Sequence, residues 1–129
     1  MCDSVKPIGG YFGWEFPMSK VHIPHESGVF VNSGHNALAL LLQCLKPLKK
    51  VYVPFYTCGI VHKTVAESKV EYHYYHINLD LELAEDIHLE PGEYLVYTNY
   101  FGIKDAYVRC LYKKYGEHLI IDNAQAFLA

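Results

Sequence analysis

The sequence predicts an α/β fold in which a mainly parallel sheet carries helices on both of its faces. From residue 29 onward, short β-branched or apolar segments alternate with segments of helical periodicity. Such alternation requires crossover connections, which build a three-layer arrangement of helices around a parallel sheet. With 129 residues, 51% of them hydrophobic and 19% charged, the chain is long and apolar enough to bury such a core.

Two regions differ in composition. Residues 1–28 are irregular because glycines and prolines interrupt every period, and aromatic residues such as Tyr11 and Trp14 lie between them. We expect this region to be an aromatic arm laid on a protein surface. Residues 29–129 are expected to form one α/β domain, since no repeat or linker divides them.

Each element follows from a local pattern. After an extended lead-in over residues 28–31, a turn at Asn32-Ser33-Gly34 leads into the first helix. The patterns predict helices over residues 35–48, 59–68 and 104–115, and strands over residues 51–56, 70–77, 93–98 and 118–121. A loop rich in Asp, Glu and Leu separates the second and third strands. Gly116 follows the third helix, where glycine commonly ends helices.

The composition narrows the partners and the compartment. A net charge of −3 gives no basic stripe, so a nucleic-acid partner is not expected. No signal segment is visible and no apolar run approaches the length of a membrane span, so a membrane partner is not expected either. The four cysteines form no C-x-x-C pair, and Cys44 and Cys110 fall in helical patterns. We therefore expect buried free thiols and a reducing, cytoplasmic location.

The histidines do not predict a metal site. His73 and His76 lie on one predicted strand at an odd spacing, which directs their side chains to opposite faces of the sheet. The chain also lacks the G-x-G-x-x-G, P-loop and nucleophile-elbow motifs. Dinucleotide, nucleoside-triphosphate and α/β-hydrolase sites therefore have no support.

The segment from His118 to Phe127 carries the most specific chemical signal. Its apolar strand delivers Asp122 to a carboxyl end, which is where open α/β sheets bind ligands. Gln125 adds an amide three residues later. A carboxylate and an amide in this arrangement suit a cofactor with a basic ring nitrogen.

Two further turns are candidates for the same edge of the sheet. Ser33, Gly34 and His35 begin a helix, where free backbone N–H groups bind phosphate, although a serine that only caps the helix is an open alternative. Tyr56 lies at a strand end and would stack on a flat ring, or it belongs to a strand-to-helix turn without a ligand. Asn99-Tyr100-Phe101-Gly102, taken alone, is only a turn.

Taken in order, these pieces resemble a known family. Gly-Gly near the start, Asn-Ser-Gly-His-Asn-Ala-Leu, Val-Pro-Phe-Tyr-Thr, Asn-Tyr-Phe-Gly and Ile-Asp-Asn-Ala-Gln-Ala are similar to motifs of the DegT/DnrJ/StrS sugar aminotransferases. These enzymes depend on pyridoxal 5′-phosphate and have the aspartate-aminotransferase (type I) fold. The resemblance spans nearly the whole chain and implies a partial large domain, the N-terminal part of such an enzyme.

The resemblance implies a role for each candidate residue. Asp122 would pair with the pyridine nitrogen and keep it protonated, and Gln125 would hydrogen-bond the phenolic oxygen. Ser33, Gly34 and His35 would hold the phosphate. Cys58 stands where the family usually carries the aromatic residue that stacks on the ring, so Tyr56 would substitute for it.

The resemblance also sets the expected activity. A complete relative transfers an amino group from a donor to a keto-sugar nucleotide, and its active sites form between two subunits, so a homodimer is expected. The family's Schiff-base lysine lies well downstream of Asp122, and no lysine follows that residue here. We therefore expect a truncated aminotransferase-like protein that is inactive on its own. The alternative is a non-catalytic, dimeric α/β binding or interaction domain.

Overall fold

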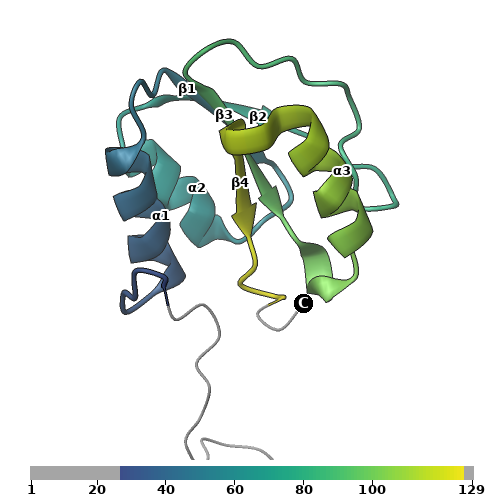
Figure 1. Cartoon of the computed structure of the whole chain (residues 1–129), viewed down its shortest axis with the longest axis horizontal. Coiled ribbons are helices and arrows are strands. Elements are labelled where there is room, and N and C mark those ends of the chain that lie inside the picture. The colour runs from purple at the N-terminus through teal and green to yellow at the C-terminus, as the bar shows by residue number, and fades with distance from the viewer. Residues whose placement is uncertain (1–26, 127–129) are drawn as a thin grey trace, which may run out of the picture.

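The computed structural model describes residues 27–126, which form a parallel sheet with helices packed against it (Figure 1). The helices are α1 (Gly34–Cys44), α2 (Gly59–Glu67) and α3 (Asp105–Tyr115), with short 3₁₀ turns η1 (Tyr100–Gly102) and η2 (Gly116–His118). The strands are β1 (Lys50–Pro54), β2 (Glu71–Tyr75), β3 (Glu93–Thr98) and β4 (Leu119–Asp122). The predicted α/β class is confirmed.

The four strands lie in the order β2-β1-β3-β4, and every neighbouring pair is parallel. The two central strands are the most buried, and each residue of β3 is inaccessible to solvent or nearly so. The edge strand β2 buries only its last residue, Tyr75. This gradient follows from the order, because a central parallel strand is covered on both faces and on both edges.

Helices cover both faces of the sheet. On one face, α1 and α2 pack over a buried cluster formed by Leu42, Val51, Val53, Val61, Val65, Tyr94, Val96 and Ile120. On the other face, α3 packs over a cluster formed by Tyr75, Ile87, Leu95, Tyr97, Tyr100, Leu111 and Tyr115. Adjacent strand residues point to opposite faces, so β3 contributes to both clusters. The predicted three layers are therefore present.

The connection from β2 to β3, residues 76–92, contains no helix and is instead held by tyrosine hydroxyl groups. The hydroxyl of Tyr97 donates to the carbonyl oxygen of Leu81 at 2.7 Å, and that of Tyr115 donates to Ile87 at 2.8 Å. These bonds satisfy backbone groups that a crossover helix would have paired internally. They fix the connection on the face of the sheet that α3 covers.

Several predicted boundaries are wrong by a few residues. The first helix ends at Cys44 rather than residue 48, because a residue that precedes proline, here Lys46 before Pro47, disfavours helical backbone. The last strand begins one residue later than expected and includes Asp122 itself. The predicted strand over residues 93–98 is confirmed.

The prediction of buried thiols is wrong. Cys44 and Cys110 are free but exposed, as is Cys58, because α1 and α3 turn other residues toward the sheet. Most of the aromatic arm predicted for residues 1–28 lies outside the described residues. None of the helices described for this chain has the length and apolar character needed to cross a membrane.

An ion pair between buried Glu93 and partly exposed Lys50, at the amino end of the sheet, makes stability depend on pH. Glu93 is 7% exposed, its carboxylate lies 3.0 Å from Lys50 Nζ, and it accepts a hydrogen bond from the backbone N–H of Glu90. Burial alone would raise the pKa of Glu93, but the bonds from Glu90 and Lys50 together lower it. A lowered pKa contributes stability at neutral pH that is lost as the pH falls through the folded-state value.

We expect the Glu93→Gln variant to lose less stability than the parent chain when the pH is lowered from about 6 to about 3, a range that spans the ordinary glutamate pKa of about 4.3. Chemical denaturation at a series of pH values measures this. Glu67→Gln is the matched control. The Glu67 carboxylate is also paired with a lysine, at 3.8 Å from Lys63 Nζ, but both side chains are exposed, so this pair contributes little to stability. Parallel pH profiles for the Glu93→Gln variant and the parent chain would contradict the expectation.

Candidate cofactor site at the carboxyl edge of the sheet

The sheet has a topological switch point between its two central strands. After β1 the chain enters α2 on one face, and after β3 it enters α3 on the opposite face. Neighbouring strands that send the chain to opposite faces create the crevice in which open α/β sheets bind ligands. The start of α1, the turn η1 and the end of β4 lie at this same end of the molecule (Figure 1).

Side chains bridge the two strands at this point. Thr57 and Thr98 share a hydrogen bond between their hydroxyl oxygens at 2.9 Å. The hydroxyl of buried Tyr100 donates to the carbonyl oxygen of Tyr56 at 2.6 Å. Burial raises the pKa of Tyr100 to about 12, so this hydroxyl keeps its proton at neutral pH. The protein's own groups therefore tie the segments that follow β1 and β3 together.

Asp122 is the last residue of β4 and pairs in register with Thr98, so its carboxylate lies beside the switch point. The side chain is half-buried, and Oδ1 accepts a hydrogen bond from the backbone N–H of Ala124 at 2.9 Å. This turn orients the carboxylate and uses only one of its oxygens. The sequence placed Asp122 at a strand end correctly.

Gln125 is held through its side-chain oxygen. Its Oε1 accepts a hydrogen bond from the backbone N–H of Phe101 at 3.2 Å. An amide has separate donor and acceptor atoms, so this bond leaves the Nε2 hydrogens as the donors that Gln125 offers. The side chain is exposed, which makes those donors accessible.

The Ser33-Gly34-His35 turn has a structural role that the sequence left open. The Ser33 hydroxyl oxygen accepts from the N–H of Asn36 at 3.2 Å and caps α1. Nδ1 of His35 lies 2.5 Å from the hydroxyl of buried Thr64 and ties α1 to α2, so this nitrogen is already engaged within the chain. A Cβ added at Gly34 would meet no atom within 4 Å. What the turn offers a ligand is its open backbone N–H groups.

Tyr56 is 59% exposed and stacks on Tyr100, with ring centroids 5.9 Å apart and planes 25° from parallel. Its carbonyl oxygen accepts the Tyr100 hydroxyl, so both ends of the residue contact the same neighbour. Within the chain, Tyr56 therefore stacks on the side chain of Tyr100. Its predicted stacking on a ligand ring stays a prediction.

Asn99 is a residue whose importance sequence reasoning missed. It follows β3 directly, is 2% exposed, and donates through Nδ2 to Asp105 at 2.8 Å and to Asn123 at 3.1 Å. Its side-chain oxygen is buried, and no donor among the described residues reaches it. The available signal was an amide residue placed immediately after a strand with an apolar centre, Tyr94–Tyr97.

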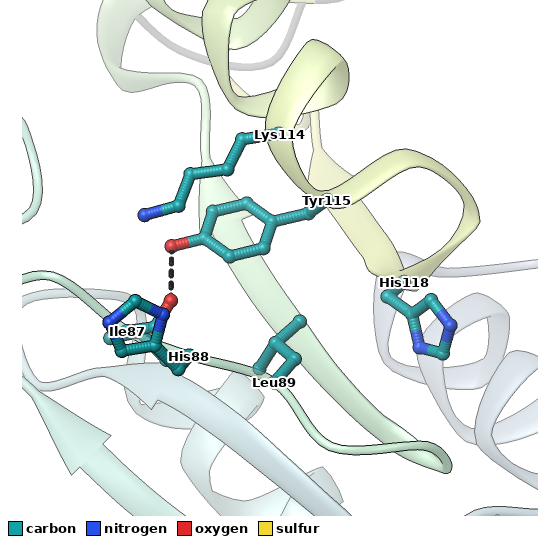
Figure 2. A pocket seen from close by; sticks show the side chains of 6 residues that line it. All are labelled: Ile87, His88, Leu89, Lys114, Tyr115 and His118. Atoms are coloured by element: carbon teal, nitrogen blue, oxygen red, sulfur yellow. Dashed lines mark hydrogen bonds between the residues drawn. The ribbon is translucent and has the colours of Figure 1, made fainter.

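One hollow of the surface lies away from the carboxyl edge. A depression of about 270 Å³ is lined by Ile87, His88, Leu89, Lys114, Tyr115 and His118 (Figure 2). In it, Tyr115 donates to the Ile87 carbonyl oxygen, and Lys114 is paired with the carboxylate of Asp86, so these polar groups already have partners. Within residues 27–126, no group of three or more His, Cys, Asp and Glu residues is arranged to hold a metal ion.

Comparisons of the chain with protein-family models, with curated proteins and with solved structures found no match. The family resemblance therefore stays a prediction, and any function proposed for the chain depends on the geometry of the carboxyl edge.

Proposed function

We propose that this chain binds pyridoxal 5′-phosphate at the carboxyl edge of its sheet, as part of the large domain of a sugar-aminotransferase-like protein. The observation that carries the proposal is the placement of Asp122. Its carboxylate ends β4 in register with Thr98, one strand from the switch point, and its turn leaves an oxygen for a ligand. Gln125 follows on the same turn and is anchored by Phe101.

The residues present fit the parts of this cofactor. The Asp122 carboxylate would accept a hydrogen bond from the protonated ring nitrogen, and Gln125 Nε2 would donate to the phenolic oxygen. The backbone N–H groups of Gly34 and His35 would hold the phosphate, which the positive end of the α1 dipole also favours. The open space at Gly34 lets an anion approach the backbone closely.

When bound, the cofactor supplies an electron sink for chemistry at a carbon next to nitrogen. The contribution of the chain is to hold the proton on the ring nitrogen through the Asp122 carboxylate. Lys104, which follows the η1 turn, is bonded to Glu82 at 2.7 Å and so is engaged away from the crevice. We therefore expect binding by residues 27–126 to be noncovalent. Amino transfer to a keto-sugar nucleotide, in a homodimer, is the activity that the family resemblance implies for a complete relative.

The second candidate is a non-catalytic, dimeric interaction domain. Large apolar side chains are exposed on the edge strand β2 (Tyr72 and Tyr74) and on α1 (Leu40 and Leu41). An edge strand with accessible aromatic residues is a common site of association between chains. This surface is compatible with the first candidate as well, and only ligand binding separates the two.

Titration of the purified chain with pyridoxal 5′-phosphate, followed by its absorbance, tests the proposal. We expect saturable binding, at least about tenfold weaker binding of pyridoxal, which lacks the phosphate, and competition by inorganic phosphate. Equal affinity for pyridoxal would contradict the role of the α1 turn. Absence of saturable binding in a chain that self-associates would favour the interaction domain.

A further inference from the structure

We infer that Asn99 is the positioning residue of the candidate site, because it holds the Asp122–Gln125 turn against the end of β3. The inference depends on the proposed function for the identity of the ligand, and on the contacts of Asn99 for the mechanism. Asn99 itself has no assigned contact with the cofactor. It acts through Asp122 and Gln125, the residues that would touch the cofactor.

Three hydrogen bonds join the segment after β3 to the turn after β4. The backbone N–H of Asn99 donates to the carbonyl oxygen of Asp122 at 2.9 Å, and its Nδ2 donates to Asn123 Oδ1 at 3.1 Å. Two residues on, the backbone N–H of Phe101 donates to Gln125 Oε1 at 3.2 Å. The same short segment therefore holds the backbone of Asp122 and the side chain of Gln125.

The orientation of the Asn99 amide is determined by its surroundings. Nδ2 lies between the side-chain oxygens of Asp105 and Asn123. Exchanging the oxygen and nitrogen of the amide would bring three acceptors together without a donor, next to a carboxylate. Asp105 is the first residue of α3, so the Asn99 side-chain amide links three segments: the end of β3, the turn after Asp122 and the start of α3.

The segment after β3, residues 99–101, also has an unusual backbone conformation next to its bond with Gln125. Phe101 has φ of 55°, in the left-handed region of backbone conformation that residues other than glycine rarely adopt. Phe101 is also exposed, so its side chain gains little from this position. In this conformation the Phe101 N–H donates to Gln125 Oε1. A strained residue and a buried amide with an unpaired oxygen are features that an optimally stable turn would avoid.

The test compares Asn99→Ala and Asn123→Ala with their double variant. Asn123→Ala removes the acceptor of the same hydrogen bond from an exposed position, so it probes the bond even where Asn99→Ala fails to fold. The matched control is Asn78→Ala, because Asn78 also fixes a turn by accepting from the N–H groups of Asp80 and Glu82, in the connection between β2 and β3.

Two readouts are needed. Amide hydrogen exchange without ligand reports the turn through the N–H groups of Ala124 and Ala126, which bond to Asp122 and Asn123. Titration with pyridoxal 5′-phosphate reports affinity and the pH at which the bound ring nitrogen loses its proton. We expect each single variant to speed exchange and weaken binding by about tenfold, the double variant to add little, and the nitrogen to deprotonate at lower pH.

The outcomes separate this inference from the proposed function. Faster exchange at the turn in a chain that binds no pyridoxal 5′-phosphate would refute the cofactor and support the positioning role of Asn99. Unchanged exchange in Asn99→Ala and Asn123→Ala would overturn the inference, whatever the parent chain binds. So would an equal loss of affinity in Asn78→Ala, since the effect would then be general destabilisation.

Discussion

Replacing Asp122 by asparagine should weaken the binding of pyridoxal 5′-phosphate by about tenfold to a hundredfold. Asparagine has the same shape and keeps an oxygen for the N–H of Ala124, so the turn is preserved. What it removes is the negative charge opposite the protonated ring nitrogen. Hydrogen bonds between charged groups contribute about 1.5–3 kcal/mol, which corresponds to that range of affinity.

The measurement is the equilibrium dissociation constant of the cofactor, with the pH titration of the bound ring as a second signal. The control is Asp86→Asn, because Asp86 also carries a charge-assisted hydrogen bond, to Lys114, away from the carboxyl edge. Equal affinity of the Asp122→Asn variant and the parent chain would show that the carboxylate does not face the ring nitrogen. The same pKa of the bound ring in both proteins would lead to the same conclusion.

The largest effect on stability is expected at Leu95. This side chain is fully buried in the central strand β3, in the cluster beneath α3. Truncation to alanine removes buried methyl groups and leaves a cavity that the neighbouring tyrosines, bonded through their hydroxyl groups, cannot fill by moving. Leucine-to-alanine changes at such positions cost about 2–5 kcal/mol, and we expect a value in the upper half of that range.

Urea denaturation of the Leu95→Ala variant measures this loss as a change in the free energy of unfolding. Leu79→Ala is the matched control. It is the same chemical change, but Leu79 is fully exposed in the connection between β2 and β3. We expect the control to lie within about 0.5 kcal/mol of the parent chain. Similar losses in both variants would mean that the cluster beneath α3 is not packed as described.

Local periodicity was sufficient for the fold class and for much of the site. The run before Asp122 is apolar and short, so its carboxyl end could be located from the sequence alone. The short run of aromatic and aliphatic residues within 93–98 likewise predicted a strand that the structure confirms. Both inferences need only the period of a strand and the place where it stops.

The remainder depends on contacts between distant segments. The role of His35 is set by Thr64, and that of Asn99 by Asp122, Asn123 and Asp105, which no local pattern identifies. The exposure of Cys44 depends on which face of α1 meets the sheet. Strand order is also nonlocal, and the switch point exists only because β3 pairs with β1 on the side opposite to β2.

Nuclear magnetic resonance of the uniformly labelled chain, titrated with pyridoxal 5′-phosphate, locates the bound ligand on the sheet. We expect saturable shifts of the backbone signals at Ser33–Asn36 and Asp122–Gln125, with smaller shifts at Asn99 and Phe101. Saturable shifts centred instead on the depression lined by His88, Lys114 and His118 would place the ligand at the wrong end of the sheet. That result, or no shift at all, would contradict the proposed cofactor site.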